Sequence, residues 1–141
     1  SYFPDRHGVW ARAEAALDAV CAATGARLLV AGAIPQDGRT AARALDWCQA
    51  EGADLVLVLH GGFTMGDVSR AFAAGSLPVG FWAVPEPVLT GDIQLNGFVS
   101  LNMSLSIARG VRDLRAQPVA WYHGAPADPA LRLRLARTLR A

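Results

Sequence analysis

Polar and aromatic side chains that could contact a ligand follow an apolar run at residues 55–59. That run ends at His60, and two glycines then lead to Phe63 and Thr64. An unbroken apolar run is typical of a parallel strand buried on both faces, and glycines let backbone amides turn toward a ligand. Because open α/β sheets bind ligands at the carboxyl ends of their strands, we predict a binding loop at residues 60–64. The alternative is a tight turn in which His60 only bonds a neighbouring carbonyl group.

Two later segments carry further candidates for the same site. Glu86 lies between two prolines after an apolar run, and Asn96 and Asn102 lie near the start of a helical pattern. Amide and hydroxyl groups there suit sugar hydroxyl groups as well as helix capping, and a solvated loop carboxylate is the alternative for Glu86. The chemistry of His60 suits either a general base or a hydrogen-bond donor to a ligand, and we predict it as a ligand-binding residue. The predicted ligand-binding residues are His60, Phe63, Thr64, Glu86, Asn96 and Asn102.

Helices and strands alternate along the chain. Apolar periodicity together with glycine and proline positions predicts helices near residues 9–24, 38–51, 64–75, 99–114 and 129–141. Thr64 and Asp67 resemble a capping box, and Asp128 before Pro129 resembles an N-cap. Strands are predicted at residues 27–33, 54–60, 79–84 and 119–123, with a long loop at 85–96. The pattern indicates a doubly wound, flavodoxin-like α/β fold with four parallel strands between two helical layers.

The first predicted element is a helix, whereas doubly wound domains normally open with a central strand. We therefore expect residues 1–141 to form a single α/β domain that lacks its first strand and belongs to a longer, multidomain chain. Such a sheet would leave an uncovered edge or gap.

The composition favours a globular domain and gives little support to several partner classes. The net charge is +1 and 52% of the residues are hydrophobic, so we expect neither nucleic acid nor a membrane as a partner. We expect a cytoplasmic protein. Every basic residue is arginine, which excludes a P-loop. The histidines show no metal-ligand spacing, and Cys21 and Cys48 are expected to be structural thiols.

Taken together, the segments that follow the predicted strands resemble the L-fucose isomerase-like proteins, a superfamily that includes the L-arabinose isomerases. The resemblance covers residues 53–141 in the right order, while the first third of the chain fits only by its α/β pattern. The segments that carry it are Leu59–Thr64, Trp82–Pro87, Leu95–Asn102, Trp121–Gly124 and Thr138–Ala141.

The resemblance implies an N-terminal α/β domain of an oligomeric enzyme that interconverts aldoses and ketoses with a divalent metal, usually Mn²⁺. It implies that Phe63 and Thr64 correspond to the aromatic and hydroxyl pair of the arabinose branch, and Asn102 to part of its Asn-Leu-Asn tract. Ser100 replaces the first Asn of that tract, and residues 85–86 replace a His-Thr-Gln segment. The metal ligands of the family lie in later domains.

The sequence thus predicts a domain for substrate recognition and subunit contact, with no catalytic residue and no metal ligand of its own. Its expected partners are a small sugar and further copies of the enzyme. The alternative is a non-catalytic sugar-binding or regulatory α/β module that uses the same loops. A receiver-type signalling domain is a weaker alternative, because no acidic cluster follows a first strand.

Overall fold

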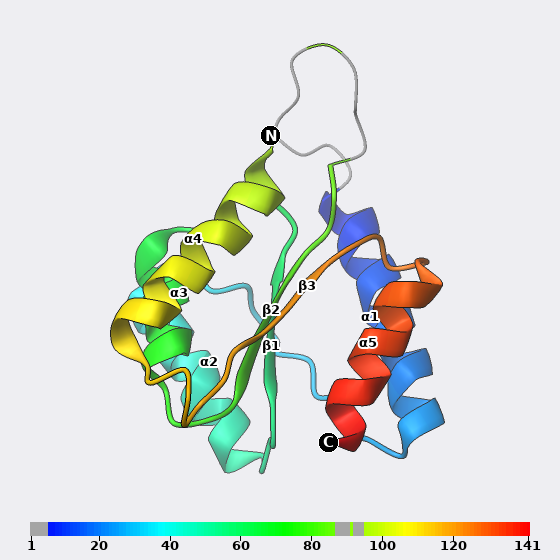
Figure 1. The fold of residues 1–141 in the computed structure, drawn as a ribbon, viewed down its shortest axis with the longest axis horizontal. Coiled ribbons are helices and arrows are strands. Elements are labelled where there is room, and N and C mark those ends of the chain that lie inside the picture. The colour runs from blue at the N-terminus through cyan, green and yellow to red at the C-terminus, as the bar shows by residue number, and fades with distance from the viewer. Residues whose placement is uncertain (1–5, 87–90, 92–94) are drawn as a thin grey trace.

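The protein is an α/β sandwich of three layers, described here from a computed structural model that covers residues 6–86, 91 and 95–141 (Figure 1). Three parallel strands lie in the order β1–β2–β3, which confirms the predicted fold class. The elements are α1 (Arg6–Thr24), α2 (Gly38–Ala50), β1 (Val56–His60), α3 (Gly66–Ala74), β2 (Val79–Ala83), α4 (Asn96–Val111), β3 (Ala120–His123) and α5 (Pro129–Arg140).

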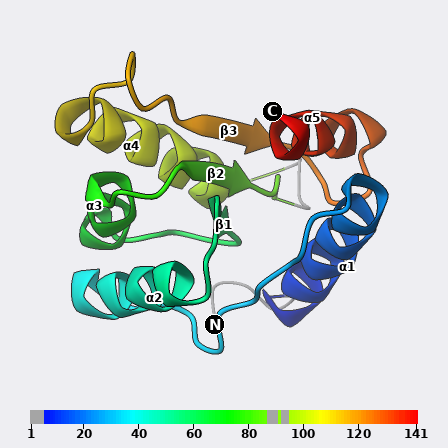
Figure 2. The same ribbon diagram turned by 90° about the horizontal axis from the view of Figure 1, so that it is seen from below.

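The two faces of the sheet are covered by different helices. Figure 2 shows α2, α3 and α4 on one side and α1 with α5 on the other. Neighbouring residues of β2 point to opposite faces, as the pleat of a strand requires. Phe81 therefore packs in the core under α3 and α4, while Trp82 packs against α1 and α5. Trp82 has no exposed surface, and its Nε1 donates to the Gly124 carbonyl oxygen at 3.0 Å, so it is a core residue.

Several helix ends follow directly from local sequence. Asp37 caps α2, because its carboxylate accepts the Thr40 amide at 2.7 Å while the Thr40 hydroxyl accepts the Asp37 amide. Asp128 caps α5 through the Ala130 amide, with Pro129 as the first helical residue. Gly25 ends α1 with φ of +75°, a conformation that favours glycine. The ends at Asp128 and Gly25 confirm the predictions.

The strand predicted at residues 27–33 is wrong. The backbone at residues 26–31 has no regular structure, and the sheet has three strands instead of four. A strand needs a hydrogen-bonded neighbour, and within the described residues no backbone hydrogen bond joins residues 27–35 to β1. High strand propensity alone does not create such a neighbour.

The capping box predicted at Thr64 and Asp67 is also wrong. Helix α3 begins at Gly66, and its N-cap residue, Met65, makes no side-chain capping bond. The Thr64 hydroxyl bonds His60 instead. The Asp67 carboxylate accepts the Gly38 amide at 2.9 Å, so it joins α3 to the start of α2. Both side chains therefore form tertiary hydrogen bonds in place of the predicted capping box.

Helix α4 spans Asn96–Val111, about three residues earlier at both ends than predicted. The Glu86 carboxylate accepts the Gly97 amide and thereby supports the earlier start. The loop predicted at 85–96 includes residues 87–90 and 92–94, which lie outside the described residues. No described helix has the length and apolar character needed to span a bilayer.

Candidate site at the carboxyl edge of the sheet

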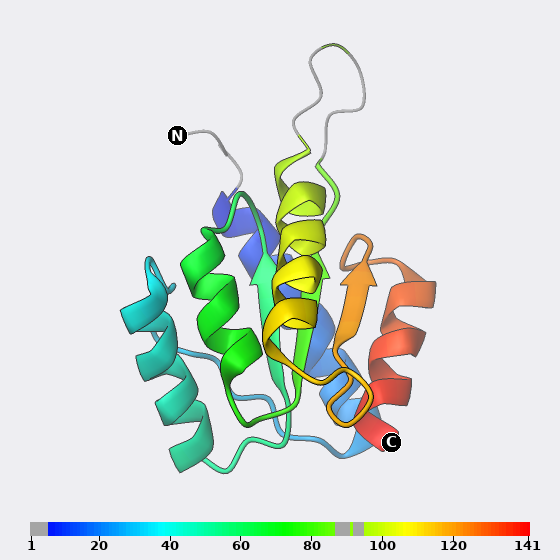
Figure 3. The ribbon, with the colours of Figure 1, turned by 60° about the vertical axis from the view of Figure 1, so that its left-hand side comes forward.

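The first turn of α4 joins the loops that follow all three strands, at what we call the carboxyl edge of the sheet. Figure 3 shows the three strands pointing toward the end at which α4 begins. After β2, Glu86 Oε1 accepts the Gly97 amide at 2.5 Å. A Cβ atom at Gly97 would lie 2.9 Å from the Val84 carbonyl oxygen, so only glycine allows this close approach.

Ser100 joins the loop after β1 to α4. Its hydroxyl oxygen accepts the Thr64 amide at 2.8 Å and donates to the Gly62 carbonyl oxygen at 3.2 Å. The side chain is fully buried. Two backbone groups of the loop are therefore held by a single hydroxyl group, which fixes the loop against the helix.

The loop after β3 contacts the same turn through aromatic rings. The Phe98 and His123 rings meet edge to face, with centroids 5.8 Å apart and planes at 77°. The Gly124 amide donates to the Ala83 carbonyl oxygen at 3.2 Å, which holds this loop beside the end of β2. The three loops thus converge at one edge, as expected for parallel strands.

His60 lies beneath this edge in a network of hydroxyl groups. Its Nδ1 is 2.7 Å from the Thr64 hydroxyl oxygen, and its Nε2 is 3.1 Å from the Ser104 hydroxyl oxygen. Ser104 donates its own proton to the Ser100 carbonyl oxygen at 2.7 Å, and Ser69 bonds Ser104 at 2.8 Å. Ser104 must therefore accept from His60, which places the imidazole proton on Nε2 and makes Thr64 the donor to Nδ1.

The imidazole of His60 is uncharged at neutral pH. The side chain has no exposed surface and stacks on Phe81, with ring centroids 5.8 Å apart. Burial lowers the pKa of His60 to about 4, because desolvation disfavours the charged ring. A ligand at the surface cannot touch this residue in the structure. In the structure His60 bonds the Thr64 hydroxyl group, and its contact with a ligand stays a prediction.

The other predicted site residues lie at or near the surface. Phe63 is 56% exposed, whereas Thr64, Glu86 and Asn96 are half-buried. Asn102 is exposed one turn beyond Phe98, which is itself 49% exposed. We call the exposed rings at this edge the aromatic rim, formed by Phe63, Phe98 and His123.

Two pockets among the described residues lie away from the aromatic rim. One, of about 300 Å³, lies beside β3 and α5, and the other, of about 780 Å³, lies beside β1. Thr64 contributes to the larger pocket, but Phe63, Glu86 and Asn96 line neither of them. Apart from the buried His60, the predicted residues lie at or near the surface, and of them only Thr64 lines a described pocket.

Metal-ligating residues do not cluster in the described part of the chain, where no group of three or more His, Cys, Asp or Glu side chains lies together. Both cysteines are free thiols, Cys21 buried and Cys48 half-buried. Burial raises the pKa of each thiol, so both stay protonated at neutral pH. The burial and protonation of both thiols agree with the structural role expected for Cys21 and Cys48.

The sequence analysis missed the buried hydroxyl network and a buried arginine. Ser100 and Ser104 are one turn apart on α4, and this spacing on a helix face that is otherwise apolar was the available signal. Arg112 lies at the other end of the same helix and donates to the carbonyl oxygens of Ala73, Gly75 and Leu77. It satisfies groups at the end of α3 that the helix leaves unpaired.

Comparisons with known proteins do not identify a family for this chain. No family model matches it, and neither a curated protein nor a solved structure matches it significantly. A functional assignment therefore depends on the motifs in the sequence and on the geometry of the carboxyl edge.

Proposed function

We propose that this chain is the sugar-recognition domain of a metal-dependent aldose–ketose isomerase of the L-fucose and L-arabinose type. One observation carries the proposal. The start of α4 contacts the loops after β1 and β2 and the last residue of β3, and the aromatic rim lies at this edge beside hydrogen-bonding groups. Four of the five segments that resemble the isomerases meet at the start of α4, whereas the fifth, Thr138–Ala141, lies at the end of α5.

A sugar would use both kinds of group at the rim. Its C–H faces pack against the Phe63 and Phe98 rings, and its hydroxyl groups bond the amides of Asn96 and Asn102. The buried network below holds the loop in one conformation before the sugar arrives. Preorganisation of this kind lowers the entropic cost of binding.

The charge at the start of α4 favours a neutral sugar over a sugar phosphate. Helix N-termini attract anions because their first amide groups are unpaired. Here the Glu86 carboxylate already accepts the Gly97 amide. A phosphate group placed at this turn would meet a negative charge and one fewer free amide, so an unphosphorylated sugar is the favoured ligand.

The isomerisation itself belongs to the complete enzyme. There a Mn²⁺ ion would polarise the sugar oxygens while protons move through an ene-diol. No residue group described in this chain fits such an ion, so this domain supplies orientation and subunit contact. Exposed apolar side chains near the rim, at Met65, Leu95 and Val99, suit contact with another subunit of a cytoplasmic homo-oligomer.

Titration of the chain with L-arabinose or L-fucose, followed by amide chemical shifts, tests the proposal. We expect shifts at Thr64, Gly97 and His123, and smaller responses to the sugar phosphates. Phe63→Ala should weaken binding about fivefold, which corresponds to loss of roughly 1 kcal/mol of aromatic contact. Leu133→Ala is the control, because Leu133 is similarly exposed on α5. Absence of shifts at millimolar sugar, or equal weakening by both variants, would contradict the proposal.

The alternative is a sugar-binding module without chemistry. Burial of His60 agrees with both candidates, because neither of them uses this imidazole in an acid–base step. The two candidates predict the same binding result but differ in turnover. Isomerisation by the protein purified from its natural source, with Mn²⁺ added, would support the enzyme, whereas binding without turnover would support the module.

A further inference from the structure

The free side of β1 borders the larger of the two pockets, a mainly apolar groove of about 780 Å³. Residues 25–31 and 33–35 line it together with α1, β1 and α2, and side chains of α3, β3 and α5 complete its wall. In Figure 2, α1 and α2 diverge on the side of β1 that faces away from β2. Leu17, Leu28 and Leu29 are half-buried in this wall, so the groove is hydrophobic on both sides of the sheet plane.

The backbone of β1 has hydrogen-bonding groups directed into the groove. The Val56 amide donates to Pro78 and the His60 carbonyl accepts from Val84, so these alternate residues of β1 face β2. In a parallel ladder the intervening residues, Leu57 and Leu59, then direct their amide and carbonyl groups to the opposite side. Among the described residues no backbone hydrogen bond reaches them from residues 27–35.

The two helices beside the groove are supported elsewhere. Helix α1 packs on α5, and α2 packs on α3, so neither covers the free edge of β1. The two helices lie on opposite faces of the sheet plane (Figure 2), and side chains of both line the groove.

We propose that one apolar β-strand docks in this groove, parallel to β1 and between β1 and residues 28–33. The position of α1 fixes the direction of this strand. Val9, near the start of α1, lies beside Gly61, which directly follows β1. A strand that leads into α1 therefore ends level with the end of β1 and runs parallel to it.

The handedness of crossover connections fixes its place in the strand order. Connections between parallel strands are right-handed in nearly all proteins. The connections through α3 and α4 advance from β1 toward β3 on one face, whereas α1 lies on the opposite face. A right-handed connection through α1 to residues 28–33 must run the other way, so its strand lies on the β1 side of those residues.

The occupant that fits is accordingly an apolar strand joined to the start of α1, about five residues long to match β1. Both of its faces would contact apolar walls, so it needs an unbroken apolar run like that of β1 itself. The docked strand would pair with Leu57 and Leu59 on one side and allow residues 28–33 to pair on the other.

Amide hydrogen exchange on an extended chain tests the proposal. The extension places a five-residue Val and Ile strand and a short Gly-Ser linker ahead of Ser1. We expect the Leu57 and Leu59 amides to exchange at least about tenfold more slowly than in the unextended chain, and the unfolding midpoint to rise. The control extension has the same length but replaces the apolar residues with Ser, and should leave both measurements unchanged.

Three results would overturn the proposal: no slowing with the apolar extension, equal slowing with both extensions, or slow exchange already present in the unextended chain. The last result would mean that residues 28–33 or a second copy of the chain fill the groove. Sedimentation would distinguish them, because a second copy makes a dimer and residues 28–33 leave a monomer. If the extended chain aggregates, the same strand added as a free peptide with terminal arginines decides the question. It should slow exchange of the same two amides, and failure to do so would also overturn the proposal.

Discussion

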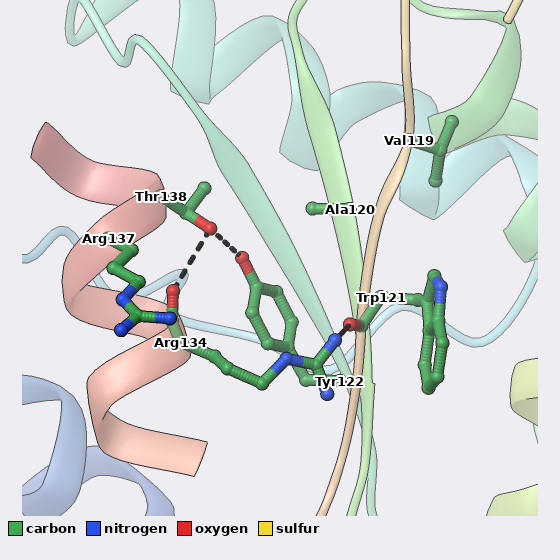
Figure 4. Close-up of a pocket in the computed structure, with 7 residues that line it drawn as sticks. All are labelled: Val119, Ala120, Trp121, Tyr122, Arg134, Arg137 and Thr138. Atoms are coloured by element: carbon green, nitrogen blue, oxygen red, sulfur yellow. Dashed lines mark hydrogen bonds between the residues drawn. The ribbon is translucent and has the colours of Figure 1, made fainter. Parts of the chain in front are cut away.

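The two edges of the sheet are finished in different ways. At β3, the Arg134 guanidinium donates to the Trp121 carbonyl oxygen at 2.8 Å and lies over the Trp121 and Tyr122 rings (Figure 4). At β1, no described side chain bonds the outward backbone groups, and a groove of about 780 Å³ lies beside them. Exposed strand edges invite pairing with other chains, and charged side chains are a common protection.

Among the described residues, side chains close the β3 edge of the sheet but not the β1 edge. The Tyr122 hydroxyl bonds the Thr138 hydroxyl, which ties the last strand to α5, and the pocket left there has only about 300 Å³. The β1 edge has apolar walls and no such tie. Apolar walls on both sides are typical of a strand position in the interior of a sheet, and the β1 edge resembles such a position.

The largest expected effect compares one leucine near each edge. Leu131 on α5 is 2% exposed in the core beside β3 and does not line the groove, so Leu131→Ala should lower the free energy of unfolding by about 2–5 kcal/mol. Leu29 is half-buried and already faces the groove, so Leu29→Ala should cost under about 1 kcal/mol. Urea denaturation of both variants measures the difference. Equal losses would mean that the groove is filled in solution.

Acid should lower the free energy of unfolding by destabilising the end of β1, because His60 is the last residue of this strand. The pKa of His60 is about 4 in the folded protein and near 6.5 when unfolded, so the unfolded chain binds the extra proton between these values. Stability from this group is complete above pH 6.5 and falls by roughly 3 kcal/mol as the pH drops to 4. Denaturation of wild type and His60→Gln at several pH values isolates it. A variant that keeps the wild-type slope would refute this assignment.

A smaller effect is expected at the tie between β3 and α5. Tyr122→Phe removes the bond to Thr138, and the free energy of unfolding should fall by about 1 kcal/mol. Thr138→Val removes the same bond from the other side. The two changes should be less than additive in a double-mutant cycle, whereas full additivity would show that the hydroxyl groups act independently.

The smallest change in stability is expected for Arg134, because its side chain is exposed. Arg134→Gln should cost no more than roughly 0.5 kcal/mol, yet it uncovers the Trp121 carbonyl group at the β3 edge. Light scattering at high protein concentration should then detect more self-association. Arg137→Gln is the matched control, because Arg137 lines the same pocket without a described bond to β3. Equal association of both variants would show that charge alone matters.

Local chemistry made part of this fold predictable. Asp37 and Asp128 cap helices within three residues of themselves, and Gly25 ends α1 by its own conformation. The convergence of the strand-end loops followed from the shared direction of parallel strands. None of these inferences requires knowledge of a distant partner.

The remaining features depend on distant partners. Residues 27–33 have the composition of a strand but no strand beside them with which to pair. Thr64 and Asp67 match a capping pattern, yet His60 and Gly38 compete for their side chains. The bond from Glu86 to α4 likewise depends on how the chain packs after β2. Sequence patterns indicate which groups need partners but not which partners they find.

Two indole rings give the groove a spectroscopic signature. Trp10 on α1 and Trp47 on α2 line it and are 39% and 36% exposed, whereas Trp82 is fully buried elsewhere. Filling the groove would remove water from the first two rings and leave the third unchanged. Their fluorescence emission should then move to shorter wavelength and become harder to quench with acrylamide. The protein therefore contains its own optical reporter for occupancy of its open edge.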